Sequence, residues 1–154
     1  MTLKAVAAVS MAATSDHPPR PEGPILFFDG GCALCHGAVR RLLRWERSGH
    51  LTTPPIRFAP LDGPTAESLR STGQLPESQE AVVLWTGTVA LEGEAAAEAA
   101  LDAIGRTGWA GAFRILPRIL RRAGYRMTAR NRHRWFGRMP EGCPMPAEPD
   151  RMLP

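Results

Sequence analysis

The sequence places two cysteines directly after a short apolar segment and a glycine turn. Ile25–Phe28 is apolar throughout, Asp29–Gly31 follows it, and Cys32 and Cys35 open a stretch with helical periodicity. An apolar run of this length between turn residues is typical of a strand buried on both faces. A helix N-terminus carries unpaired N–H groups and the positive end of the helix dipole, which stabilise a thiolate. The pattern therefore predicts a strand, a tight turn and a reactive cysteine pair at the start of a helix.

The spacing of Cys32 and Cys35 puts them one helical turn apart and favours redox chemistry. One thiolate can attack a disulfide, and the second cysteine can resolve the mixed disulfide that forms. We expect Cys32 to attack, because its sulfur should lie nearest the helix end and solvent, and Cys35 to resolve. The alternative is half of a zinc site completed by Cys143 and a histidine. Zinc ribbons usually supply a second Cys-x-x-Cys, which this sequence lacks, so we expect a redox pair with no metal ion or cofactor.

Asp29, three residues before Cys32, has two interpretations. Its carboxylate can tune a thiol, and Cys35 is the better proton partner because a negative charge beside Cys32 opposes thiolate formation. It can equally hold the turn by accepting the backbone N–H groups of Gly31 and Cys32. Gly30 and Gly31 would let the backbone of a partner approach Cys32 closely.

Two further residues are candidates for supporting roles. His36 follows Cys35 directly and either stabilises a thiolate or faces solvent. Cys143 is either a third redox thiol or a cysteine of the C-terminal tail.

Composition limits the class of protein. The chain has 154 residues, of which 44% are hydrophobic and 22% charged, and this suits one globular domain. Three cysteines are too few for a secreted disulfide scaffold, so the Cys-x-x-Cys indicates a reducing compartment, and we expect a cytoplasmic protein. No run of about 18 apolar residues occurs, which predicts no membrane-spanning segment.

The net charge of +4 is unevenly distributed along the chain. Residues 63–102 contain seven acidic residues and one arginine, whereas residues 106–138 contain ten arginines and no acidic residue. Arg130 and Trp135 in the second segment are candidates for contacts with the redox site or a partner. Such a segment can bind nucleic acid, form a solvated helix face, dock on the acidic part of the chain or near the redox site, or recruit an acidic protein. We favour the solvated and docked arrangements over nucleic acid.

The order of the predicted elements indicates an α/β fold. Strands are expected at Ile25–Phe28, Ile56–Ala59, Ala81–Trp85 and Thr88–Leu91, and helices at Ala33–Arg47, Pro64–Thr72 and Glu94–Ile104. A strand-helix-strand crossover makes parallel neighbours, and a hairpin across Thr86-Gly87 adds an antiparallel strand. This is the order of a thioredoxin-like three-layer fold with a four-stranded mixed sheet, in which a Cys-x-x-Cys at the first helix marks the active site.

A helical C-terminal extension is expected at about residues 106–138. Pro117 should start or kink a helix there, and Gly137 should end it. Arginines occupy the other faces of this segment. The apolar residues that recur at helical spacing are Leu116, Ile119, Leu120, Ala123 and Met127.

The two ends of the chain are expected to lie outside the folded domain. Lys4 and the alanine-rich segment after it loosely resemble a signal peptide, but we favour a disordered leader at residues 1–23, with Met11 as an alternative start. Residues 24–138 then form the thioredoxin-like domain, and residues 139–154 form a proline-rich tail.

Two motifs resemble a known family. Asp29-Gly30-Gly31-Cys32-Ala33-Leu34-Cys35 is similar to the Asp-x-x-Cys-x-x-Cys signature of the DCC family of thiol-disulfide oxidoreductases, and residues 125–138 are similar to that family's C-terminal signature. Cys143, which precedes Pro144, is similar to a cysteine often found at this place in the family. The resemblance therefore runs from about Pro24 to Cys143. It implies a thioredoxin-like fold and a disulfide-containing protein or small thiol as substrate, with an electron donor that the sequence does not identify. Unlike thioredoxins, the chain has no tryptophan before Cys32 and has Ala-Leu between the cysteines.

Overall fold

Four strands form one mixed sheet in the computed structural model, which describes residues 23–48, 54–77, 82–105, 107–140 and 149–154. The strands are β1 (Ile25–Phe28), β2 (Arg57–Pro60), β3 (Val83–Trp85) and β4 (Ala90–Glu92). Their order is β2-β1-β3-β4, with β1 parallel to β2 and β3 antiparallel to both of its neighbours. The predicted four-stranded mixed sheet is therefore confirmed.

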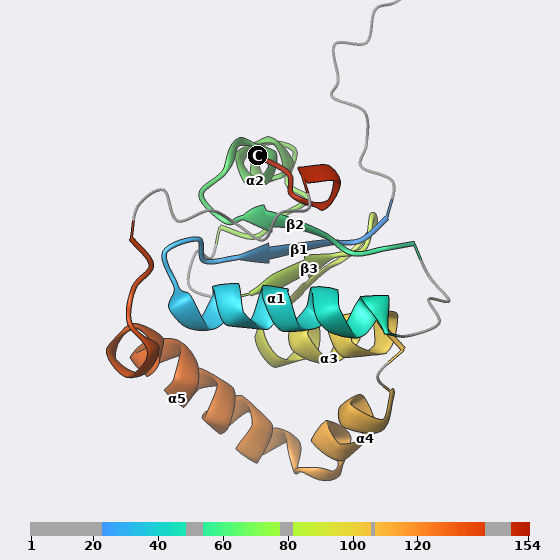
Figure 1. Cartoon of the computed structure of the whole chain (residues 1–154), viewed down its shortest axis with the longest axis vertical. Helices are drawn as coiled ribbons and strands as arrows, with labels where there is room; N and C mark the ends of the chain where they lie inside the picture. Colours follow the sequence, from blue (N-terminus) through green and yellow to red (C-terminus); the bar gives the residue numbers. More distant parts are fainter. Residues whose placement is uncertain (1–22, 49–53, 78–81, 106, 141–148) are drawn as a thin grey trace, which may run out of the picture.

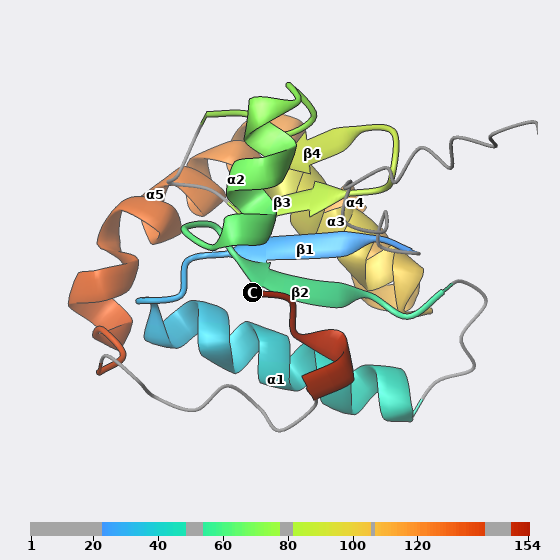
Figure 2. The same ribbon diagram turned by 90° about the horizontal axis from the view of Figure 1, so that it is seen from above.

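Helices cover both faces of the sheet. Helices α1 (Ala33–Arg47) and α3 (Gly93–Ala103) lie on one face, and α2 (Pro64–Ser71) lies on the other (Figure 1). The same three layers are seen from above in Figure 2. This is the thioredoxin-like fold that the element order predicts, and α1 occupies the predicted residues.

The first strand lies at the centre of the molecule and contributes to two cores. Side chains alternate across a strand, so Leu26 and Phe28 pack toward α1 and α3, while Ile25 and Phe27 pack toward α2. All four are at most 4% exposed. Burial on both faces explains why this strand is apolar without interruption, and it fixes the position of the turn that follows.

The C-terminal extension consists of two helices, α4 (Thr107–Ile115) and α5 (Arg118–Phe136). Pro117 is the N-cap of α5, and α5 packs against α1 and α3 (Figure 1). The apolar residues that recur at helical spacing face solvent, with Ile119 82% and Met127 55% exposed. The inner face of α5 carries Tyr125 and Arg132 instead.

Acidic partners on α3 pair with arginines of the extension. Arg121 lies 2.7 Å from Glu98 of α3, and Arg122 lies 3.4 Å from Glu94. Arg114 of α4 pairs with Glu98 and, at 2.6 Å, with Asp102. Part of the arginine-rich segment thus docks on the acidic part of the chain, one of the arrangements favoured above.

The last described residues pack on the sheet edge. The short helix η1 (Pro149–Arg151) is followed by Met152, which pairs with Phe58 of β2, and Figure 2 shows this segment beside β2. Arg151 lies 2.6 Å from the buried Glu46 of α1 and donates from Nε to the carbonyl of Ile56 at 2.9 Å. Residues 1–22 of the leader expected at residues 1–23, and Cys143, lie outside the described residues. Within the described ranges, no helix has the length and apolar character needed to cross a membrane.

Candidate active site

The turn after β1 is held by Asp29. Its Oδ1 accepts the N–H of Gly31 at 2.9 Å, and its carbonyl accepts the N–H of Cys32 at 3.2 Å. The prediction that the Asp29 carboxylate holds the turn is therefore correct for the N–H of Gly31. The N–H of Cys32 donates to the backbone carbonyl of Asp29 and not to its carboxylate. The turn delivers Cys32 to the start of α1.

Cys32 is the N-cap of α1. Its Sγ accepts the N–H of Cys35 at 3.4 Å, and both cysteines are free thiols. Cys32 is fully buried and Cys35 is 8% exposed. The helix position of Cys32 is as expected, but the expectation that its sulfur lies near solvent is wrong.

The segment after α5 accounts for the burial of Cys32. Gly137–Met139, which we name the strap, runs antiparallel to residues 31–33, with Arg138 opposite Cys32. Ala33 N–H donates to the carbonyl of Gly137 at 3.4 Å, and Met139 N–H donates to the carbonyl of Gly31 at 3.0 Å. Gly137 has φ +81°, which a glycine adopts without strain as it ends the helix and turns the chain toward the thiols.

Two side chains at the end of α5 contact Asp29. Arg132 donates to its Oδ2 from Nη2 at 2.8 Å and from Nε at 3.2 Å, and His133 Nε2 lies 3.2 Å from the same oxygen. Burial raises the pKa of the Asp29 carboxyl, but the hydrogen bonds from Arg132 and Gly31 and the nearby positive charge outweigh burial and lower it. Asp29 is therefore ionised at neutral pH.

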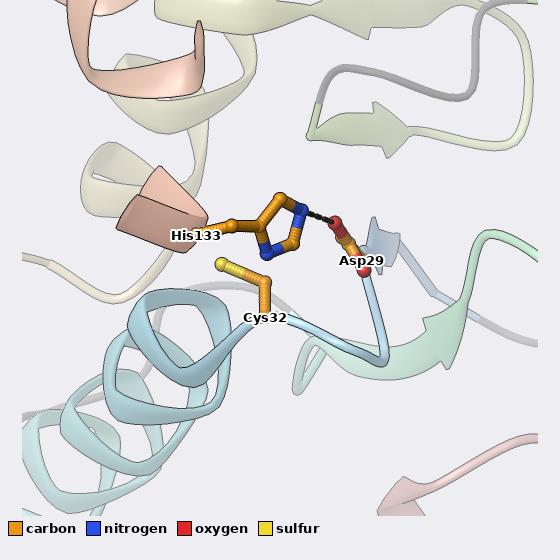
Figure 3. A group of neighbouring side chains, drawn as sticks. All are labelled: Asp29, Cys32 and His133. Atoms are coloured by element: carbon orange, nitrogen blue, oxygen red, sulfur yellow. Dashed lines mark ion pairs between the residues drawn. The ribbon is translucent and has the colours of Figure 1, made fainter. Parts of the chain in front are cut away.

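His133 brings an imidazole to the buried thiol. One ring nitrogen of His133, the Sγ of Cys32 and a carboxylate oxygen of Asp29 all lie within 4.8 Å of one another (Figure 3). His133 lies within the C-terminal motif at residues 125–138, but the resemblance assigns no role to this histidine. The sequence feature that could indicate a role for His133 is its position next to Arg132, near the end of the arginine-rich helix.

Cys35 faces a pocket of about 70 Å³ between the turn, α1 and α5. Asp29, Leu34, Val82, Tyr125, Thr128, Ala129 and Arg132 complete its lining. Burial raises the pKa of the Cys35 thiol well above its ordinary value, and the neighbouring Cys32 and Asp29 raise it further. The Tyr125 hydroxyl accepts the N–H of Val82 at 3.1 Å and its ring packs against Gly93, which fixes this wall of the pocket.

The other predicted residues within the described part are His36, Arg130 and Trp135. His36 is buried, so the solvent-facing alternative is wrong; its Nε2 lies 2.8 Å from the carbonyl of Gly30, and its ring packs edge-on against Phe28. It supports the turn. Arg130 and Trp135 are exposed on α5.

The residues around Cys32 also include donors that metals use. Asp29, Cys32 and His133 form the group of potential ligands within the described residues. Both oxygens of Asp29 already accept hydrogen bonds, however, and the guanidinium of Arg132 contacts the oxygen that faces His133. A cation at this point would be repelled by Arg132, so the residues present do not fit a metal ion well.

Comparison with known proteins agrees with this chemistry. Residues 26–138 match the family of DCC1-like thiol-disulfide oxidoreductases. The uncharacterized protein YuxK of Bacillus subtilis (strain 168) is 31% identical over 133 residues, which cover 84% of this chain and 93% of that protein. No solved structure matches the chain.

Proposed function

The chain belongs to the DCC1-like thiol-disulfide oxidoreductase family, and we propose that it exchanges its Cys32–Cys35 dithiol with a disulfide bond of a second molecule. The observation that carries the proposal is the pair of free cysteines at the start of α1, where the Cys35 N–H donates to the Sγ of Cys32. That hydrogen bond and the positive end of the helix dipole both stabilise a thiolate on Cys32.

The first attack is assigned to Cys32. Because burial and the neighbouring groups raise the pKa of Cys35, this second thiol stays protonated at neutral pH. The Cys32 thiolate attacks one sulfur of the substrate disulfide, forms a mixed disulfide and releases the first substrate thiol. The geometry of the N-cap thus supports the order of attack even though Cys32 is buried.

Resolution follows from the position of Cys35 one turn into the helix. Cys35 attacks Cys32 Sγ, which forms the Cys32–Cys35 disulfide and breaks the bond to the substrate sulfur; the proton that Cys35 loses goes to that sulfur, which departs as the second substrate thiol. Two electrons pass to the substrate, and a separate electron donor restores the dithiol. The substrate is a disulfide-containing protein or the disulfide of a small thiol, and we place the protein in the cytoplasm, where reducing conditions maintain the dithiol.

Access to Cys32 requires the strap to move. Two described backbone hydrogen bonds join the strap to residues 31 and 33. A backbone hydrogen bond contributes about 1 kcal/mol net, so parting the strap costs far less than global unfolding. A local opening of Gly137–Met139 would therefore expose the sulfur while the sheet stays intact.

Trapping tests the proposal. With a model disulfide substrate, Cys35→Ser should accumulate a mixed disulfide on Cys32, because no thiol is placed to resolve it. Cys32→Ser should form none and lose turnover, while Cys143→Ser measures whether the third cysteine takes part in turnover. Full disulfide-reductase activity in both Cys32→Ser and Cys35→Ser would overturn the proposal. Polynucleotide binding that depends on salt and ignores the redox state would instead favour the arginine-rich binding module considered above.

A further inference from the structure

We propose that His133 is the proton acceptor for Cys32 and that Asp29 orients it, so that these three residues form one catalytic relay. The inference rests on the proposed thiol-disulfide exchange and adds a residue to it. It rests on an arrangement that the two cysteines alone do not explain. His133 of α5 and the ionised Asp29 of the turn after β1 both lie beside the buried thiol of Cys32.

The two ring nitrogens of His133 have different surroundings. Nε2 lies 3.2 Å from Asp29 Oδ2. Nδ1 is buried and has no hydrogen-bond partner within the described residues. Figure 3 shows this second nitrogen on the side of the ring where Cys32 Sγ lies. An unpartnered ring nitrogen beside a thiol is a place to which a proton can move.

Asp29 determines which nitrogen carries the proton in the neutral ring. An ionised carboxylate can only accept hydrogen bonds, so Nε2 beside it must be the N–H donor. Neutral imidazole has one N–H, and Nδ1 therefore holds the lone pair. The contact with Asp29 thus prepares the nitrogen on the Cys32 side to accept a proton.

Arg132 removes the electrostatic objection to a carboxylate beside a thiolate. Its two hydrogen bonds to Oδ2 pair the negative charge of Asp29 with a positive one. A proton that moves from Cys32 to His133 then creates a thiolate and an imidazolium beside an already balanced ion pair. In a site where Cys32 is fully buried, this mutual stabilisation is stronger than it would be in water.

The strap links the relay to substrate access. Gly137 N–H donates to the carbonyl of His133 at 3.1 Å, so the strap that covers Cys32 begins at the helix end that carries the histidine. Arg132 anchors that helix end to Asp29. The strap can therefore part from the turn while His133 stays beside the sulfur.

Protons and electrons balance through one exchange step. The proton of Cys32 moves to His133 Nδ1 while Sγ attacks the substrate disulfide, forming one S–S bond and breaking another. The departing substrate sulfur leaves as a thiolate and takes the proton from His133, which returns to its neutral form. The substrate disulfide is the oxidant, and no other co-reactant is needed.

The test measures the rate at which iodoacetamide alkylates Cys32 across a range of pH. A Cys35→Ser/Cys143→Ser background leaves Cys32 as the one thiol of the chain. His133→Gln is compared with Arg134→Gln, the exposed neighbour on α5. The described charged groups near Cys32 and His133 remain in both variants: Asp29, Arg132 and Arg138. Tyr125, which lines the pocket that Cys35 faces, remains as well. We expect His133→Gln to react about 100-fold more slowly at neutral pH and to match the background at alkaline pH, where hydroxide replaces the histidine as proton acceptor. Arg134→Gln should follow the background throughout.

A second measurement remains valid even if a variant fails to fold. Nitrogen NMR of the unmodified protein should show His133 with its proton on Nε2, and Asp29→Asn should shift the proton toward Nδ1. A His133→Gln profile that matches the background, or a wild-type ring protonated on Nδ1, would overturn the relay. These results would leave the proposed function standing if Cys35→Ser still traps a mixed disulfide, so the two failures are distinguishable.

Discussion

Arg132 donates two hydrogen bonds to one carboxylate oxygen of Asp29, at 2.8 and 3.2 Å, across 103 positions of sequence. Asp29 belongs to the turn that delivers Cys32, and Arg132 belongs to the last long helix. The contact makes α5 part of the thiol site. The C-terminal extension therefore completes the site as well as packing on the domain.

Replacing Arg132 with methionine should weaken both the fold and the reactivity of Cys32. A hydrogen bond to a charged partner contributes about 1.5–3 kcal/mol, and an unpaired Asp29 would oppose a thiolate nearby. We expect the free energy of unfolding in urea to fall by about 2 kcal/mol and alkylation of Cys32 to slow. Arg134→Met, at the exposed next position, is the control. Equal stability and equal alkylation in the two variants would show that the contact with Asp29 has no such role.

Acid should weaken the same contact. The pKa of Asp29 is lowered in the folded protein, because the bonds from Arg132 and Gly31 and the positive charges outweigh the effect of burial. A lowered pKa contributes stability above the unfolded-state value, about 3.9, and the contribution is lost as the pH falls through the folded value. The difference in free energy of unfolding between wild type and Asp29→Asn should therefore shrink below about pH 4. Urea unfolding at several pH values measures it, and a difference that stays constant in acid would refute this expectation.

Loosening the strap should expose Cys32. Met139→Pro removes the N–H that donates to the carbonyl of Gly31, whereas Met139→Leu keeps it and serves as the control. Loss of one such bond, about 1 kcal/mol, corresponds to about a fivefold larger open population. We expect Cys32 in Met139→Pro to be alkylated about fivefold faster at a fixed pH. If the rate does not rise, the strap is not what limits access to the sulfur.

The edge of β2 should depend on the pair between Arg151 and Glu46. Glu46 is buried, and its carboxylate accepts the N–H of Ile56 as well as the guanidinium of Arg151. Removing one partner of such a pair leaves a buried charge and costs about 3 kcal/mol, so Arg151→Leu should lower the free energy of unfolding by that amount. Arg118→Leu, at an exposed position, should change it by less than about 0.5 kcal/mol. Replacing Glu46 and Arg151 together with leucine should recover most of the loss, and failure to do so would point to a packing defect instead.

Local patterns were sufficient to predict much of the fold. The strand at Ile25–Phe28, the turn at Asp29 and the helix at Ala33–Arg47 are encoded by neighbouring residues, and the structure has them at those positions. The prediction of the hairpin is less accurate, because β4 starts at Ala90 and not at Thr88. The turn extends from Thr86 to Val89, where the N–H of Thr86 donates to the carbonyl of Val89. Short strands are set by pairing with neighbours, which a single-sequence pattern does not show.

The parts that the sequence could not predict depend on contacts between distant residues. The inward face of α5 follows from acids on α3 and from Asp29, so the apolar stripe that includes Ile119 and Met127 faces solvent. The burial of Cys32 follows from the strap, which pairs with it through Arg138. His133 reaches the thiol for the same reason, whereas His36, adjacent to Cys35 in sequence, turns toward Gly30.

The most direct test of the central claim is a redox titration of Cys32 and Cys35. The protein is equilibrated with thiol-disulfide buffers of defined potential and alkylated, and mass spectrometry then quantifies the disulfide, with metal content measured on the same sample. A reversible Cys32–Cys35 disulfide that fits a two-electron couple in metal-free protein is the predicted result. Absence of this disulfide at every potential, or a stoichiometric metal ion that holds both thiols, would contradict the account.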